Sequence, residues 1–164
     1  MNRARLAVVC LAVVVISLPD GCRPTTSPDK VVHVRVDHPQ MNGAIKKARA
    51  SVGTFIAALQ SPKPGQVGFK VKAKFEEGSK VEDIWLDHVT YDGTNFRGGI
   101  ANAPERVKNV KFGEKATVAP AEISDWMYLD NRKLVGGETV RVWLETLSPA
   151  ERGNFEKMVD IVVE

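Results

Sequence analysis

The side chains in this chain that could carry out chemistry are few and widely spaced. Its histidines are His33, His38 and His88, and no two have the i, i+4 spacing at which a helix presents two ligands to one zinc ion. There is no Cys-x-x-Cys pair either. The sequence therefore predicts no metal site, and no motif in it indicates a bound cofactor.

A small hydrolase is the enzymatic alternative. Ser124 and Asp125 are adjacent, and His88 would have to join them across the fold to complete a triad. The Gly-x-Ser-x-Gly turn that exposes a serine nucleophile is absent. A Ser-Asp pair before a strand more often closes a turn through side-chain-to-backbone hydrogen bonds. We therefore predict no catalytic residue, and keep a site near His88 and Asp125 as the alternative.

Residues 121–137, "AEISDWMYLDNRKLVGG", form the densest stretch of the chain. Alternation along a strand places Trp126 and Tyr128 on one face and apolar side chains on the other, which favours a packed hairpin with Trp85 and Trp143 as packing partners. The functional interpretation is a recessed patch that binds a peptide or an acidic group. Its residues would be Trp126, Tyr128, Arg141, Gly136 and Gly137.

Neither glycine pair of the chain forms a phosphate loop. Gly98-Gly99 and Gly136-Gly137 lack the lysine and the Ser/Thr that complete such a loop. Gly136-Gly137 does precede a predicted helix, whose free N–H groups could hold an anion. A turn that requires positive φ or close packing is the simpler explanation of this pair.

Basic residues give no sign of a nucleic-acid partner. The formal net charge is only +3, whereas nucleic-acid binding needs positive charge clustered on one face. Lys70, Lys72 and Lys74 alternate with apolar residues in "GFKVKAKF", but the aromatic residues that would stack on bases point the other way. We predict that these lysines form a solvated strand face, which is also the surface that a toxin-neutralising interaction protein would use.

The hydrophobic pattern predicts the elements that position these residues. "VVHVRVD" at 31–37 alternates as a short strand, and a stripe of apolar residues from Met41 to Leu59 predicts one amphipathic helix of about five turns. A run of strands follows from Phe69 to Val135, and two helices end the chain, the second opened by the capping box Ser148-Pro149-Ala150-Glu151. This order predicts an α+β fold, a twisted antiparallel sheet of about five strands packed against a long N-terminal helix and a C-terminal helix pair.

The N-terminal segment is typical of an export signal. Arg3 and Arg5 precede an apolar run from Leu6 to Leu18, which is shorter than the ~20 residues of a membrane span. Gly21-Cys22 resembles the end of a bacterial lipobox, although Pro19 stands where that box prefers an aliphatic residue. We predict a signal peptide at 1–21, lipidation at Cys22, a Pro/Ser/Thr-rich tether at 22–30 and a single α+β domain at 31–164.

Five segments together resemble the bacterial family catalogued as domain of unknown function 2314. They cover residues 41 to 155 in order: "MNGAIKKAR", "FKVKAKF", "EDIWLDHVTYDGTNFRGGIANAP", "VKFGEKATVAPAEISDWMYLDNRKLVGGETVRVWL" and "LSPAERGNF". The resemblance implies no activity and no catalytic residue for this chain.

These observations favour an exported, membrane-anchored binding or accessory module of the bacterial cell envelope that is not catalytic. Its expected partner is an envelope protein or polymer, and its lipidated N-terminus would hold it to the membrane, facing the periplasm or the cell exterior. The alternatives are the small hydrolase and the toxin-neutralising interaction protein. The first requires His88 and Asp125 to meet in a cleft, and the second requires an exposed Lys70–Lys74 surface.

Overall fold

The computed structural model describes residues 8–9 and 39–163 of the chain. The predicted strand at 31–37, the tether at 22–30 and Cys22 lie outside the described residues, as does the predicted signal peptide apart from Val8 and Val9. The elements in chain order are β1 (Val8–Val9), α1 (Pro39–Ala50), α2 (Val52–Gln60), β2 (Gln66–Glu77), β3 (Lys80–Tyr91), β4 (Phe96–Ile100), β5 (Lys115–Val118), a 3₁₀ turn (Pro120–Glu122), β6 (Ile123–Asp130), β7 (Lys133–Gly136), α3 (Glu138–Glu145) and α4 (Pro149–Val159).

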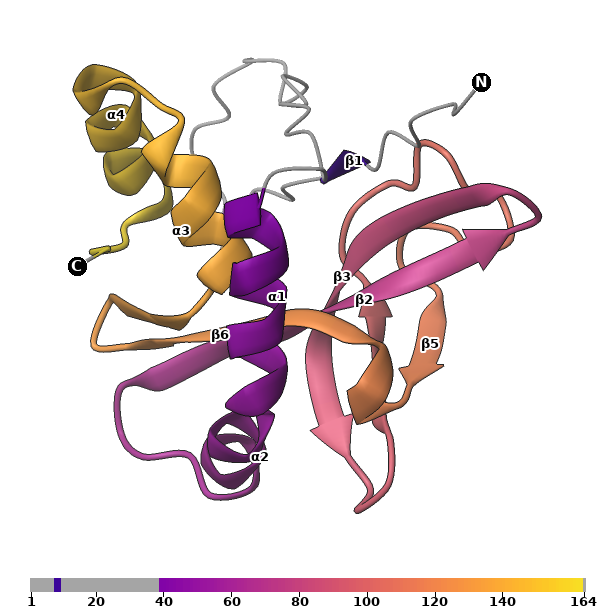
Figure 1. Cartoon of the computed structure of the whole chain (residues 1–164). Coiled ribbons are helices and arrows are strands. Elements are labelled where there is room, and N and C mark those ends of the chain that lie inside the picture. Colours follow the sequence, from indigo (N-terminus) through magenta and orange to yellow (C-terminus); the bar gives the residue numbers. More distant parts are fainter. Residues whose placement is uncertain (1–7, 10–38, 164) are drawn as a thin grey trace, which may run out of the picture.

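The strands form one twisted sheet in the order β5-β4-β3-β2-β6-β7, and every neighbouring pair on this path is antiparallel (Figure 1). Off this path, β1 pairs in parallel with β3, where Val8 lies opposite Glu82. Helices α1 and α2 precede the antiparallel strands β2–β7 in sequence, and α3 and α4 follow them. The structure therefore confirms the predicted α+β class, with one more antiparallel strand than expected.

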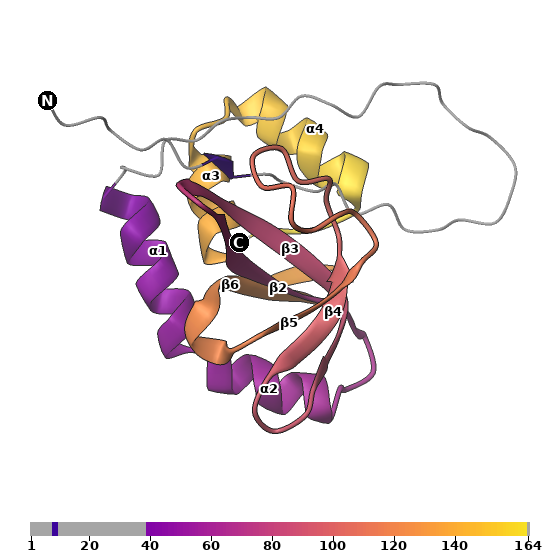
Figure 2. The ribbon, with the colours of Figure 1, turned by 90° about the vertical axis from the view of Figure 1, so that its right-hand side faces the viewer.

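Alternate residues of the strands enter two separate apolar clusters. Val71, Leu86 and Trp126 belong to the larger cluster, against which α2 packs. Trp85 and Trp143 belong to the smaller one, together with Leu134, Val140 and Leu144. Figure 2 shows α1 and α2 along one side of the sheet and α3 and α4 beyond another. Trp85 and Trp143 thus share a cluster with hairpin residues Met127, Leu129 and Leu134, whereas Trp126 and Tyr128 belong to the other cluster. The two tryptophans were predicted as packing partners of the hairpin, and they pack on its opposite face from Trp126.

The prediction of one continuous N-terminal helix is wrong, because the helix is interrupted at Ser51, between α1 and α2. In a continuous helix the Ala48 carbonyl would accept a hydrogen bond from the backbone N–H of Val52. It accepts instead from the indole Nε1 of Trp126 at 2.8 Å and from the Ser51 hydroxyl at 3.2 Å. Ser51 also donates its hydroxyl to the Lys47 carbonyl at 2.8 Å, a back-bond that bends helices.

The predicted β6–β7 hairpin and the α4 capping box are both confirmed. Asn131 and Arg132 form the hairpin turn with φ of 47° and 69°, the left-handed conformation that two-residue hairpin turns favour. At the start of α4, the Ser148 hydroxyl accepts from the Glu151 N–H at 3.3 Å, and the Glu151 carboxylate accepts from the Ser148 N–H at 2.9 Å.

Candidate functional site

The aromatic residues of the predicted binding patch lie in the core. Trp126 is 3% exposed and Tyr128 is 6% exposed. Their rings stack at a centroid distance of 6.2 Å, and Phe55 and Phe69 pack against them. Neither ring presents a surface to a ligand, so the placement favours the packed hairpin over the recessed patch.

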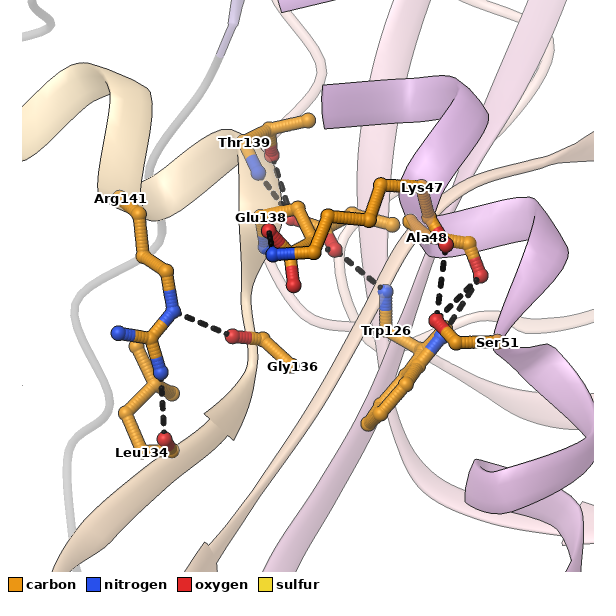
Figure 3. Close-up of polar contacts among 10 residues, drawn as sticks. Lys47, Ala48, Ser51, Trp126, Leu134, Gly136, Glu138, Thr139 and Arg141 are labelled. Carbon is orange, nitrogen blue, oxygen red and sulfur yellow. Dashed lines mark hydrogen bonds and ion pairs between the residues drawn. The ribbon is translucent and has the colours of Figure 1, made fainter. Parts of the chain in front are cut away.

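Arg141 closes the turn between β7 and α3. Its guanidinium donates from Nε to the Gly136 carbonyl at 3.0 Å and from Nη2 to the Leu134 carbonyl at 2.7 Å (Figure 3). These two bonds satisfy carbonyl groups at the end of β7. Arg141 therefore faces the backbone of its own turn, in a structural role.

Gly136 and Gly137 are required by backbone conformation and by close packing. Their φ values are +72° and +65°, in the left-handed region that glycine tolerates best. A Cβ at Gly136 would lie 2.4 Å from the Trp126 carbonyl oxygen, and one at Gly137 would lie 2.9 Å from a Leu134 methyl carbon. The glycine pair is thus explained by the turn.

A carboxylate of the chain itself binds the N-terminus of α3. Asp125 is fully buried and accepts hydrogen bonds from the backbone N–H of Glu138 at 3.1 Å and of Thr139 at 2.8 Å. It also accepts from the Trp126 N–H at 2.8 Å. Asp125 accepts backbone donors, as predicted, but it lies within β6 and binds the start of α3 instead of fixing the turn before the strand. These helix donors are therefore not left open for an outside anion.

Lys72 and Thr139 complete this buried network. The Thr139 hydroxyl donates to Asp125 at 2.6 Å and accepts from the Lys72 ammonium at 3.1 Å. The ammonium also lies 5.1 Å from the Trp85 ring centroid, within the range of a cation–π contact. Burial raises the pKa of Asp125, opposed by the charge of Lys72 and by the hydrogen bonds from Thr139.

The prediction that Lys70, Lys72 and Lys74 form a solvated face is wrong for Lys70 and Lys72. Lys70 is 8% exposed and Lys72 is 1% exposed, whereas Lys74 remains at the surface in an ion pair with Glu76. On this side of β2 the neighbours across the sheet are Trp85 and Asp125, over which α3 packs. Burial lowers the pKa of Lys70, opposed by the charge of Asp87. Lys70, Lys72 and Lys74 therefore do not together form the protruding basic surface predicted for a toxin-neutralising protein.

His88 and Asp125 do not come together. The His88 side chain is 84% exposed, and its Nδ1 lies 3.1 Å from an oxygen of Asp87. Asp125 is on β6, separated from β3 by β2, and is sealed in the core. Ser124 is also buried, and its hydroxyl donates to the Lys72 carbonyl at 3.3 Å. This geometry provides no triad of Ser124, Asp125 and His88.

The structure has an open cleft on the sheet that the sequence did not predict. It has a volume of about 420 Å³ and lies over strands β3, β4 and β5. The residues lining it are His88, Thr90, Arg97, Gly98, Lys115, Ala116 and Thr117. We call it the β3–β5 cleft.

A bulge in β3 shapes this cleft. The pairing register with β4 shifts between Asp87 and Thr90, and His88 within the bulge has a φ of 48°. The bulged backbone comes so close to β4 that a Cβ on Gly98 would lie 2.7 Å from the Asp87 carbonyl oxygen. One signal in the sequence could have indicated this bulge. The Gly98-Gly99 pair follows the predicted Asp92-Gly93 hairpin and lies opposite Asp87-His88.

The lining of the β3–β5 cleft is basic. Arg97 and Lys115 are permanently charged at neutral pH and exposed, His88 is charged when protonated, and no lining residue is acidic. Two carboxylates lie beside the cleft, Asp87 against His88 and Asp92 at 3.4 Å from Arg97. Backbone hydrogen bonds from Asn95 and Thr94 hold the pKa of Asp92 below its usual range. These carboxylates oppose the charges of the lining cations, and the His88 imidazole pairs with a carboxylate rather than with a hydroxyl nucleophile.

Two other kinds of site are not found in the part of the chain that the structure describes. No group of three or more His, Cys, Asp or Glu side chains is arranged to hold a metal ion among residues 8–9 and 39–163. In the same residues no helix is long and apolar enough to cross a membrane.

Comparison with known proteins places the chain in a family. The model of a family described as "Uncharacterized protein conserved in bacteria (DUF2314)" matches residues 38–161, which span the helices and the antiparallel sheet. This chain belongs to the DUF2314 family. The match includes the residues of the buried Asp125 network and of the β3–β5 cleft, so it confirms the resemblance seen in the sequence.

Two known proteins are similar to this chain in sequence. The uncharacterized protein YegJ of Escherichia coli K12 is 36% identical over 123 residues, which are 75% of this chain and 79% of that protein. A protein of Neisseria meningitidis serogroup B whose name refers to ankyrin repeats is 34% identical over 77 residues, 47% of this chain and 30% of that protein. The match therefore spans less than a third of the longer relative. No solved structure matches the chain.

Proposed function

We propose that this DUF2314 protein is an exported, lipid-anchored binding or accessory module of the bacterial cell envelope, without catalytic activity, and that the β3–β5 cleft is its binding site. The leader sequence and Gly21-Cys22 support export and anchoring. The expected partner is an envelope protein or polymer.

The observation that carries the proposal is a contrast between two sets of polar residues. Ser124, Asp125 and Lys72 converge, but they are buried and bonded to backbone groups and to Thr139. The exposed side chains that line the cleft are cations and threonines. A nucleophile paired with a base in an open cleft is the usual arrangement of a hydrolase. Here the open cleft has the composition of a binding site.

Intact mass tests the anchored part of the proposal. The wild-type chain and Cys22→Ala would be expressed in a bacterial host and recovered from the membrane fraction. We expect the wild type to show cleavage before Cys22 and the added mass of acyl chains, both lost in Cys22→Ala. An unacylated or uncleaved wild-type chain in the cytosol would rule out the anchored envelope protein.

Capture from an envelope extract tests the binding part. The full-length chain would be immobilised as the wild type, as the double variant Arg97→Gln/Lys115→Gln and as the control Lys46→Gln/Lys157→Gln. The control removes the same charge from exposed positions on α1 and α4. We expect the wild type and the control to retain the same envelope component and the cleft variant to lose it. Equal retention by all three chains would contradict a binding role for the cleft.

A further inference from the structure

We propose that the first half of β3 is a second binding site, which takes an extended segment of a partner protein as an added strand. The favoured segment carries a lysine or arginine among β-branched residues. We call residues 81–85 of this strand the β3 edge, and it is separate from the β3–β5 cleft on the second half of β3. This site goes beyond the proposed role of the cleft, but it rests on one part of the proposed function, the removal of residues 1–21 on export.

The β3 edge is the part of the strand that β4 leaves uncovered. β2 pairs along one side of it, and β4 pairs on the other side only from residue 86 onward. Among the described residues, the strand beside the β3 edge on this other side is β1, whose two valines pair in parallel with Glu82 and Asp83 (Figure 1). These valines belong to the predicted signal peptide, so its removal vacates the edge. An open strand edge is a template for an extended peptide.

The backbone of the β3 edge has groups that an added strand can bond. At the end of the edge, the Trp85 N–H donates to Asn102 Oδ1 at 2.9 Å, and the Trp85 carbonyl accepts from the Ala101 N–H at 2.8 Å. Both Trp85 groups therefore point away from β2. Because alternate residues of a strand bond to alternate neighbours, Val81 and Asp83 direct their N–H and carbonyl groups to the same side as Trp85.

Buried donors without an acceptor lie at this edge. In the part of the chain that the structure describes, three buried side-chain groups have no hydrogen-bond partner: Trp85 Nε1, Asn102 Nδ2 and Trp143 Nε1. Asn102 is 8% exposed and holds the Trp85 N–H through its other amide atom, and Trp143 packs in the same apolar cluster as Trp85. Unpaired buried groups are uncommon in native proteins. A carbonyl of an added peptide would supply the acceptor that Asn102 lacks.

A carboxylate at the β3 edge indicates the charge of the partner. With β1 on the edge, Asp83 lies opposite Val9 and is only 8% exposed. Its neighbour across β2 is Lys74, but the Lys74 ammonium pairs with Glu76 at 2.6 Å. Among the described residues Asp83 has no ion-pair partner. Since a covered carboxylate is costly without a cation, the favoured peptide places a lysine or arginine beside Asp83, where the leader has Val9.

Peptide binding to the processed chain, from which residues 1–21 have been removed, tests the inference. The chain would be purified from membranes as the wild type, as Asp83→Asn and as the control Glu145→Gln, which removes an exposed carboxylate on α3. The probes are labelled peptides of residues 5–12, the segment that contains β1. Each has Cys10→Ser, and they carry no further change, Val9→Lys or Val9→Glu. Fluorescence anisotropy gives the affinities, and melting temperatures show whether each chain is folded.

The charge at peptide position 9 should decide the affinity. We expect the wild type to bind the Val9→Lys peptide at least about fivefold more tightly than the Val9→Glu peptide, because Asp83 attracts the lysine and repels the glutamate. This ratio should fall below about twofold in Asp83→Asn and persist in Glu145→Gln. Equal affinities of the two peptides for the wild type, or an unchanged ratio in a folded Asp83→Asn chain, would overturn the inference.

Backbone methylation of the peptide tests strand addition itself. Successive residues of a strand direct their N–H groups to opposite sides, so only one of Val8 and Val9 donates to β3. We expect N-methylation of that residue to weaken binding at least about tenfold and N-methylation of the other to weaken it less than about threefold. Equal losses at the two positions would contradict an added strand.

Hydrogen exchange shows whether the β3 edge is open in the processed chain. We expect the Val81 and Asp83 amides to exchange fast in the chain alone and slowly with the Val9→Lys peptide. Amides already protected without peptide would show that another part of the chain, or a second copy of it, holds the edge, and would overturn the inference. A purified chain whose mass still includes residues 1–21 overturns the proposed export as well, whereas a processed chain that binds no peptide overturns this inference alone.

Discussion

The indole N–H of Trp126 donates to the backbone carbonyl of Ala48 at 2.8 Å, across 78 positions of sequence. This one bond joins the central part of β6 to the last turn of α1 and lies at the break between α1 and α2 (Figure 3). It also explains why a tryptophan next to Asp125 faces the core rather than a ligand.

Replacing Trp126 with phenylalanine should lower the free energy of unfolding by about 1–3 kcal/mol, because the change removes a buried hydrogen bond and part of a packed ring. Urea denaturation of both chains measures the difference. Tyr128→Phe is the matched control, since it keeps the ring that stacks on Phe69 at a centroid distance of 4.8 Å. A Trp126→Phe chain as stable as the wild type would contradict the structural role of this bond.

Asp125→Ala should destabilise the fold by about 3–5 kcal/mol, because it leaves the buried Lys72 ammonium and the donors at the start of α3 without their carboxylate. The double variant Lys72→Met/Asp125→Ala should cost less than the sum of the single changes Lys72→Met and Asp125→Ala, since it removes both buried charges. Urea denaturation of the four chains completes a double-mutant cycle. Strict additivity would show that Lys72 and Asp125 are not coupled.

Lys70→Met should raise the free energy of unfolding at neutral pH by about 1 kcal/mol, because a buried ammonium is replaced by an apolar side chain of similar length. The pKa of Lys70 is lowered in the folded chain, so its contribution to stability is present above the unfolded pKa and is lost as pH falls through the folded pKa. The advantage of Lys70→Met should therefore shrink as pH rises toward about 10. Denaturation at several pH values tests this, and an advantage that grows with pH would contradict it.

Gly98→Ala should lower stability by about 1–3 kcal/mol, because the new Cβ would lie 2.7 Å from the Asp87 carbonyl oxygen. Gly153→Ala is the matched control, since that position in α4 has open space around it and alanine favours a helix. We expect the control to gain up to about 1 kcal/mol. Thermal denaturation of both variants gives the comparison, and similar effects at the two glycines would argue against the close approach of β3 and β4.

Much of the fold could be predicted from the sequence, because its signals are local. The alternation in "GFKVKAKF" and the capping box at Ser148 each require only a few neighbouring residues, and both elements form as expected. The break at Ser51 could not be predicted from periodicity, because the Trp126 side chain that takes the Ala48 carbonyl is far away in sequence.

The site residues were harder to predict, because polarity does not reveal which face of a sheet is covered. Lys70 and Lys72 alternate with apolar residues as a solvated face would, yet the far side of β2 lies beneath α3 and the second apolar cluster. The β3–β5 cleft depends on a bulge at His88 and on pairing among three strands. No single segment contains that information.

Cross-linking in the living bacterium tests most directly whether the β3–β5 cleft is the binding site. A photoreactive benzoylphenylalanine would replace exposed Thr117 in the cleft or, as the control, exposed Lys157 on α4. We expect an envelope adduct from position 117 that is absent at position 157 and disappears when Arg97→Gln/Lys115→Gln is added. No adduct at position 117, or an adduct that persists without Arg97 and Lys115, would contradict the cleft as the site where this protein binds its partner.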